Sequence, residues 1–444
     1  MTDRNMNLRR AIPYSPAGSL AMSLISTVLL VCLCGTAPGQ ESAIPSVPSD
    51  RQSSGLPVDA TGGPIGSGDG EVPVFSSIEE AMANPEFAAG RAEAESEFED
   101  AASKLAELAY EMRETYIRYR NREERNAPAR RRYMEQRREV ERQMDVTYDA
   151  ALDLLRYGGD ETSMQFLVTM IEHRLKRDQY DEATLEGATR MLDGGNRLRI
   201  LFEIAARSAI VVGRFDMAKQ LYEAIDPETL EKNDAFMATF LDDFADQHTV
   251  EMAARQRDQE TNLPRVKFET SMGDFVVELF LEDAPSTVAH FLRLCEQGYY
   301  DGLDFSQVVP EMLALSGDAA GDGTGNNRQF IMDENQGESA TRRALRGSVL
   351  MAKIPTENGE FIPNSASTQF AILFLPKPHV HRNQTIIGRV IEGMDVVSRL
   401  RRIDPSKEKN EKTIEVPPDQ IFRVEILRRP DELPKTDYLQ TSRF

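Results

Sequence analysis

Few residue patterns in the chain could do chemistry by themselves, and the first is a pair of histidines. His379 and His381 are separated by one residue, and neutral imidazole is a common metal ligand. A protein metal site usually needs three or four ligands, and no third ligand can be identified from its spacing. We therefore favour a surface loop here and expect no metal or other cofactor.

The cysteines are the second candidate, because a thiolate can act as a nucleophile. Cys295 lies in the segment VAHFLRLCEQGYY, on the same face of an amphipathic helical pattern as Phe291 and Leu294. We favour a small buried apolar residue over a nucleophile. Cys32 and Cys34 lie near the N-terminus, where their preceding residues fit a lipid attachment site poorly.

A glycine-rich stretch, GDGTGNN at 321–327, raises the question of phosphate binding. Phosphate-binding loops combine such glycines with a lysine and a following helix. Neither feature is present in this stretch, so a structural turn is the better interpretation.

The charge balance narrows the classes of partner. The 444 residues include 73 acidic and 52 basic side chains, which give a net charge of -21. Such a surface repels nucleic acid phosphates and anionic lipids, so we expect neither as the main partner. A chain of this length is expected to form two or three domains.

Residues 1–40 have the pattern of a secretory signal peptide. Two arginines precede an apolar run at 17–33, and small residues follow at Ala37 and Gly39. We expect cleavage near Gly39 and an exported protein, periplasmic or otherwise extracytoplasmic. The alternative is an uncleaved segment that tethers the protein to a membrane.

Two further segments precede the strand-rich part of the chain. Residues 41–75 are rich in Gly, Pro and Ser, which predicts a disordered linker. Residues 76–262 show apolar side chains at three- and four-residue steps, which predicts helices. Glutamates interleave with the arginines of 118–142, so we favour a solvated face with helical ion pairs over an anion-binding face.

A weak internal repeat lies in the helical region. DQYDEATLEGATRM at 178–191 resembles GRFDMAKQLYEAID at 213–226, at an offset of 35 residues. This offset is close to the 34-residue period of tetratricopeptide repeats. We interpret residues 76–262 as a degenerate, tetratricopeptide-like helical domain that offers a docking surface to a protein partner.

Residues 263–430 change to a strand pattern. Val266 and Phe268 alternate with polar residues, Gly273 supplies a turn, and the alternation resumes at Phe275. Further short strands and two helical patterns follow. The fold class expected is therefore multidomain: an all-α N-terminal region, a mainly-β closed barrel with capping helices, and a tail at 431–444.

The same stretch carries six motifs in a particular order: GDFVVELFLEDAPSTVAHFLRL, GYYDGLDF, GDGTG, RGSVLMA, PNSASTQF and GRVIEGMDVV. On these motifs, residues 265–429 resemble a cyclophilin-type peptidyl-prolyl cis-trans isomerase domain. The resemblance implies an eight-stranded antiparallel barrel and a groove that binds an extended proline-containing peptide. It also implies an arginine that donates a hydrogen bond to the proline nitrogen, which eases the slow rotation of the prolyl amide.

The catalytic position departs from the family pattern. By the resemblance, Gln307 takes the position of the catalytic arginine and Ser306 that of a histidine. A glutamine can still donate a hydrogen bond, but a charged donor gives roughly twice the strength of a neutral one. The remaining groove positions implied by the resemblance are Phe305, Met312, Leu313, Leu315, Met351, Ala352, Gln369, Phe370, Ala371, His379, Val380 and Gln384.

Several of these positions also depart from the family pattern. Leu315 replaces a glutamine, Ala371 replaces a phenylalanine, and Gln384 replaces a histidine. We therefore expect a family protein that acts on proline-containing exported polypeptides as a weak isomerase or as a binder. The alternative is a non-catalytic scaffold protein whose helical domain carries the partner site.

Overall fold

The computed structural model describes residues 78–121, 127–321, 323–335, 340–405 and 418–439. The predicted signal segment and linker lie outside these residues, as does the C-terminal end of the tail. Within the described ranges, no helix is both long and apolar enough to cross a membrane.

The chain divides into two compact units, and the division falls between Phe166 and Leu167. The predicted boundary at residue 263 does mark the change from helices to strands. However, the helices from residue 167 onward belong to the same compact unit as the strands. Whether residues 76–262 fold as a separate domain therefore stays a prediction.

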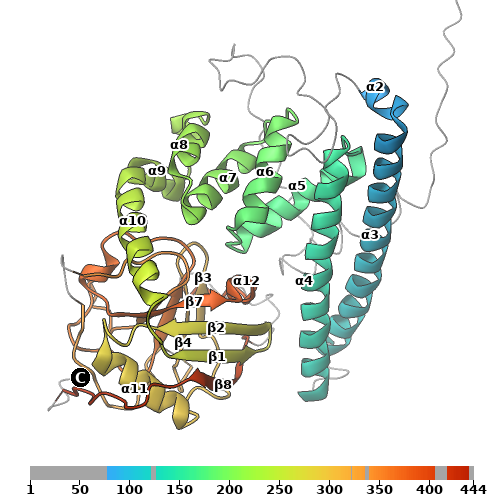
Figure 1. Cartoon of the computed structure of the whole chain (residues 1–444). Coiled ribbons are helices and arrows are strands. Elements are labelled where there is room, and N and C mark those ends of the chain that lie inside the picture. Colours follow the sequence, from blue (N-terminus) through green and yellow to red (C-terminus); the bar gives the residue numbers. More distant parts are fainter. Residues whose placement is uncertain (1–77, 122–126, 322, 336–339, 406–417, 440–444) are drawn as a thin grey trace, which may run out of the picture. The chain divides into compact units, whose positions relative to one another are not determined.

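The first unit is a long helical hairpin with short helices at its end (Figure 1). Asn84 starts its first long helix by accepting hydrogen bonds from the N–H groups of Glu86 and Phe87. Phe98 is buried in the hairpin and stands edge-on to Phe166, with 5.7 Å between ring centroids. The helices of this unit are α2 (Ile78–Ala83), α3 (Pro85–Arg120), α4 (Ala127–Arg156) and the start of α5 (Glu161–Lys176).

The helices of the second unit lead up to the strands. They are α6 (Glu182–Asp193), α7 (Arg199–Val212), α8 (Phe215–Glu223), η1 (Pro227–Thr229), α9 (Lys232–Thr239) and α10 (Leu241–Asp258). Helix α7 is buried over most of its length and packs against both α6 and α8. The two copies of the weak repeat supply α6 and α8, but a tetratricopeptide-like array remains a prediction.

Eight antiparallel strands form one sheet in the order β3-β4-β6-β5-β7-β2-β1-β8. They are β1 (Arg265–Thr270), β2 (Gly273–Leu279), β3 (Gln307–Val309), β4 (Leu313–Ser316), β5 (Ser348–Met351), β6 (Phe370–Leu373), β7 (Ile386–Glu392) and β8 (Ile421–Arg428). The expected combination of N-terminal helices with an eight-stranded antiparallel barrel fold is confirmed.

The sheet curls until the segments next to its two edge strands meet. The Gly302 N–H donates to the Ile421 carbonyl at 2.8 Å, and the Phe305 N–H donates to the Asp419 carbonyl at 2.9 Å. Helix α11 (Pro285–Glu296) packs on β8 and buries Phe291 in the core. The short helices η3 (Val380–Arg382) and α12 (Met394–Ser398) flank β7.

Ion pairs join the helices of the second unit to the barrel. Asp258 at the end of α10 accepts two hydrogen bonds from Arg342, at 2.6 and 2.8 Å, and lies 2.9 Å from Arg389. Burial disfavours the charged form of Asp258, but these two guanidinium groups outweigh it and lower its pKa. Because all three side chains are mostly buried, the pairs fix α10 to the barrel.

Candidate functional site

Three residues that depart from the family pattern lie side by side in one row across the sheet. Gln307 on β3 pairs with Leu315 on β4, and Leu315 pairs with Ala371 on β6. Their neighbours Val308 and Ala314 point into the barrel core. Since successive side chains of a strand point to opposite faces, the row lies on the outer face of the barrel.

The Gln307 side chain lies close to the glycine-rich loop. A Cβ atom built on Gly323 would lie 3.9 Å from the Gln307 Nε2. Gln369 holds this loop, because its Nε2 donates to the carbonyls of Gly323 and Gly325 at 3.1 and 2.9 Å. Gly323 therefore lies beside Gln307, and both Gly321 and Gly323 have positive φ.

Three residues that the sequence grouped with the groove lie in the barrel core instead. Phe305, Met351 and Phe370 are fully buried members of the main apolar cluster. Phe370 packs against Phe268, with 5.5 Å between ring centroids. Because Phe370 and Ala371 are adjacent on β6, only one of them can face outward. The three residues support the sheet from behind.

Two other groove residues pack into a second apolar cluster on the outside of the sheet. Leu313 and Val380 are partly buried against this cluster, which contains Leu350 and Leu373. Met312 remains 47% exposed, and His379 is also exposed. The apolar surface available to a ligand is therefore smaller than the groove positions implied by the resemblance would provide.

Two buried polar atoms at former histidine positions accept no hydrogen bond from the described residues. They are the Oε1 of Gln384 and the Oγ of Ser306. The Gln384 side chain is only 6% exposed. A buried polar atom left without a partner costs about 1–3 kcal/mol. The Ala352 N–H donates to the Gln369 carbonyl at 2.9 Å, which ties β5 to this area.

A polar cluster that the sequence did not reveal holds the turn between β3 and β4. Glu311 in this turn accepts a hydrogen bond from Arg207 of α7 at 2.5 Å and another from Asn233 of α9. Its backbone N–H donates to Asp178 at 3.0 Å. Burial disfavours the charged form of Glu311, but Arg207 and Asn233 outweigh it and lower its pKa.

Glu311 has a backbone φ of 61°, a value that costs a residue with a side chain about 1 kcal/mol or more. The only sequence signal for this cluster was an acidic residue directly after Pro310 in a turn. Nothing in the sequence linked that residue to an arginine 104 positions earlier.

The remaining sequence candidates do not form a second reactive centre. Cys295 is buried, and burial raises the pKa of its thiol, so the nucleophilic thiolate is disfavoured. The ring centroids of His379 and His381 are 6.5 Å apart. Among the described residues, no group of three or more His, Cys, Asp or Glu side chains is placed to hold a metal ion.

Comparisons with known proteins address the C-terminal part of the chain. The family model for the cyclophilin-type peptidyl-prolyl cis-trans isomerase/CLD matches residues 265–425. Peptidyl-prolyl cis-trans isomerase CYP18-2 of Arabidopsis thaliana is 34% identical over 138 residues, which are 31% of this chain and 80% of that protein. Peptidyl-prolyl cis-trans isomerase-like 1 of Aspergillus fumigatus is 32% identical over 170 residues, which are 38% of this chain and 98% of that protein.

Two further proteins are similar to the same part of this chain. Peptidyl-prolyl cis-trans isomerase-like 2 of Gibberella zeae is 33% identical over 140 residues, so this chain spans only 23% of that protein's length. A crystal structure of a cyclophilin-type isomerase from Cryptosporidium parvum is 24% identical, with a TM-score of 0.31, and covers 38% of this chain and 99% of its own. Because the match takes in at least 80% of two relatives at more than 30% identity, the chain belongs to the cyclophilin-type peptidyl-prolyl isomerase family.

Proposed function

We propose that the barrel binds proline-containing segments of exported polypeptides and isomerises their prolyl bonds only weakly. The family supplies the ligand class, since its members act on prolyl peptide bonds. Export rests on the signal-peptide pattern of residues 1–40. No cofactor takes part in this proposal, because rotation about an amide bond needs no redox or group-transfer chemistry.

The observation that carries the proposal is the row formed by Gln307, Leu315 and Ala371. In this row a neutral amide stands where the family has a charged arginine, and its two neighbours are aliphatic. Loss of one well-placed donor to a transition state typically costs a factor of about 10²–10³ in rate. Gln307 recovers part of this loss as a neutral donor.

Binding is expected to survive better than catalysis. The exposed side chain of Met312 offers apolar contact. The Gln384 Oε1 is a buried acceptor without a partner among the described residues, and an N–H group of a bound peptide would satisfy it once the Gln384 side chain turns outward. These features support a weak peptide site that requires no charged residue.

The test is two-dimensional exchange NMR with the peptide Ala-Ala-Pro-Phe and the full chain. We expect cis-trans exchange at no more than about 1% of the rate of an active family member assayed alongside. Addition of the peptide should shift the side-chain amide signals of Gln307 and Gln384. Gln384→Ala should weaken this binding, whereas Gln297→Ala, an exposed glutamine after α11, should leave it unchanged.

The second candidate is a scaffold protein whose helices carry the partner site. The observation that favours it is a set of exposed apolar side chains on helices, which includes Tyr110 on α3 and Val146 on α4, at 56% and 53% exposure. This candidate predicts no peptide-induced shift at Gln307 or Gln384. A peptide-induced shift at Gln307 that is lost in Gln384→Ala would decide in favour of the peptide site.

A further inference from the structure

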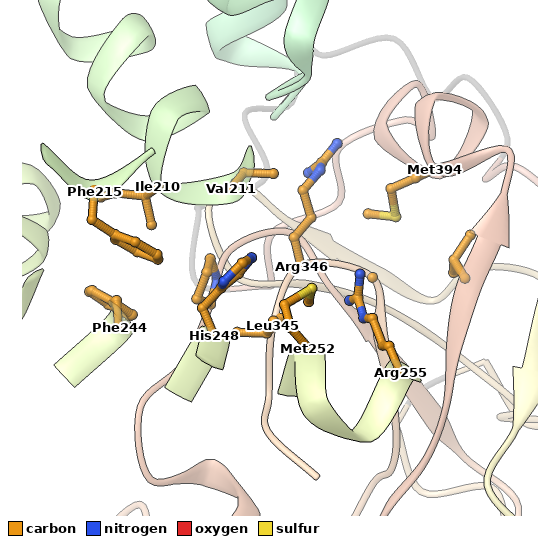
Figure 2. A pocket seen from close by; sticks show the side chains of 13 residues that line it. Ile210, Val211, Phe215, Phe244, His248, Met252, Arg255, Leu345, Arg346 and Met394 are labelled. Carbon is orange, nitrogen blue, oxygen red and sulfur yellow. The ribbon is translucent and has the colours of Figure 1, made fainter. Parts of the chain in front are cut away.

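A cavity of about 190 Å³ lies within the second unit, between its helices and the barrel. Helices α7, α8 and α10 line one side, and the segment 345–347, β7 and α12 line the other (Figure 2). An apolar cavity of about 150 Å³ is large enough to hold benzene, so this space admits a small organic molecule. The cavity lies apart from the row that contains Gln307, since no residue of that row lines it.

The polar side chains of the cavity are all basic. They are His248, Arg255 and Arg346, and no Asp or Glu side chain lines the cavity among the described residues. His248, Met252 and Arg255 follow one another at steps of four and three residues on α10, so they share one face of that helix. Figure 2 shows this face turned toward the cavity.

Arg255 has only a long contact with a carboxylate. Its nearest carboxylate is Glu251, 3.7 Å from its Nε, which is beyond hydrogen-bond distance. Glu251 is engaged elsewhere, because it accepts a hydrogen bond from the Arg343 backbone at 2.9 Å. The Arg255 Nε is buried and has no hydrogen-bond partner among the described residues. Burial lowers the pKa of Arg255, the nearby charge of Glu251 opposes this effect, and that of Arg389 adds to it.

Arg346 adds a second guanidinium group, and this one has no carboxylate in contact among the described residues. It donates to the Phe374 carbonyl at 2.9 Å and to the Ser398 hydroxyl at 2.7 Å, which are both neutral acceptors. No ion pair joins it to a described carboxylate within 4.0 Å. Arg346 lines the cavity. Its positive charge therefore makes the electrostatic potential inside the cavity more positive.

The rest of the lining is apolar and partly aromatic. Phe215 stands edge-on to His248, with 5.4 Å between ring centroids. Phe244 and Met252 extend the same wall. The cavity therefore combines two guanidinium groups with apolar walls, which complement a molecule with a single anionic group on a short hydrocarbon chain.

We infer that this cavity binds a carboxylate attached to a small apolar group, with Arg255 as its main hydrogen-bond donor. A carboxylate can accept hydrogen bonds from the terminal nitrogens of the Arg255 guanidinium, whose planar geometry suits it. Such a group can come from a free short-chain carboxylic acid or from the C-terminal residue of a polypeptide. The inference is independent of the proposed isomerase function, since it uses no residue of the groove.

The test is isothermal titration calorimetry on the full chain with two matched pairs of probes. Hexanoate and hexanamide represent the free acid, and N-acetylleucine and N-acetylleucinamide represent a C-terminal residue. We expect at least one carboxylate to bind about tenfold or more tighter than its amide, since charged hydrogen bonds contribute about 1.5–3 kcal/mol. The tighter of the two carboxylates identifies the source. Equal affinity within both pairs, or no binding of any probe, would overturn the inference.

The variant Arg255→Met keeps the length of the side chain and removes the donor. It should lower the affinity for the carboxylate at least tenfold and leave the affinity for the amide unchanged. Arg257→Met, an exposed arginine on the same helix, is the control. If Arg255→Met does not fold, the ring signals of His248 in the wild-type chain decide. They should shift on addition of the carboxylate and not of the amide, and the absence of this difference would contradict the inference.

Discussion

Arg207 on α7 and Glu311 in the β3–β4 turn form an ion pair of 2.5 Å between residues 104 positions apart. Arg207 is held in place by Asp234, to which its Nε and Nη2 donate at 2.9 and 2.6 Å. The helices thus fix the turn that connects Gln307 to Met312 and Leu315. The candidate groove is therefore built on a hairpin whose position depends on residues far outside the barrel.

This relationship predicts the effect of substitutions at Glu311. Glu311→Ala should lower the free energy of unfolding of the second unit by about 1.5–3 kcal/mol, because it removes charge-assisted hydrogen bonds. Glu311→Gly should cost about 1 kcal/mol less than Glu311→Ala, because glycine adopts the positive φ of this position without strain. Denaturant unfolding followed by NMR signals of the barrel measures both values. Glu360→Ala, in an exposed loop, should change little, and equal losses for Ala and Gly at 311 would contradict the strain argument.

Asp258 is expected to matter more than a typical surface carboxylate. Asp258→Asn removes the charge shared by Arg342 and Arg389 and leaves both guanidinium groups partly buried. Because Arg342 keeps Asp283 and Arg389 keeps Glu278, the expected loss is that of the charged hydrogen bonds to Asp258, about 1.5–3 kcal/mol. Thermal unfolding should show this loss, whereas Asp242→Asn, an exposed residue of the same helix, should be nearly neutral. A loss below about 1 kcal/mol would mean that α10 is not held by these pairs.

Glu203 on α7 should make stability depend on pH. Burial, together with the charge of Asp234, raises the pKa of Glu203 to about 7 from its ordinary 4.5. The folded state therefore binds the proton more tightly than the unfolded state, so the contribution to stability falls as pH rises from about 4.5 to about 7. Glu203→Gln should leave stability at pH 4.5 nearly unchanged and raise it by about 1–3 kcal/mol at pH 8. Urea unfolding at the two pH values checks this, and an equal effect at both would refute the assignment.

Restoring the arginine should restore only part of the activity. Gln307→Arg supplies a charged donor, and the charge alone is expected to raise the exchange rate by about tenfold or more. The triple variant that also carries Leu315→Gln and Ala371→Phe should exceed the single variant, because all three positions share one row. Exchange NMR on Ala-Ala-Pro-Phe compares the variants. Ordinary family rates in the unmodified chain would contradict the degraded-site proposal without affecting family membership.

The N-terminal pattern predicts a processed protein. N-terminal sequencing of material from the native host should start between Gly39 and Ser42. Substitution of the small residues before the cleavage point, Ala37→Leu and Gly39→Leu together, should slow this processing. Recovery of intact Met1 from the membrane fraction would establish the tethered alternative.

The barrel was largely predictable because residues close together in the sequence indicate its strands and turns. Turn glycines such as Gly273 and alternating residues such as Val266 and Phe268 specify strands by themselves. The resemblance that the motifs carry then implied the eight-stranded sheet. Side-chain direction was less certain, since Phe370 and Ala371 both matched family positions although a strand turns them to opposite faces.

The attachment of the helices could not be predicted, for a physical reason. Asp178, Asp258 and Glu311 are unremarkable acidic residues in the sequence, where each resembles the many solvated carboxylates around it. Their partners stand 84 to 224 positions away, and ion pairs leave no periodic pattern. Only the three-dimensional arrangement shows that these charges are buried and paired.

The contact between Asp178 and Arg402 also bears on the order in which the chain can fold. Arg402 donates to Asp178 at 2.7 Å across 224 positions of sequence, and burial lowers the pKa of this arginine to about 10. A ribosome makes the helices long before it reaches Arg402, so Asp178 can pair with this arginine only after nearly the whole chain has emerged. Closing so long a loop is slow. The helices of the second unit are thus expected to reach their final packing late, after the last strands of the barrel have been synthesised.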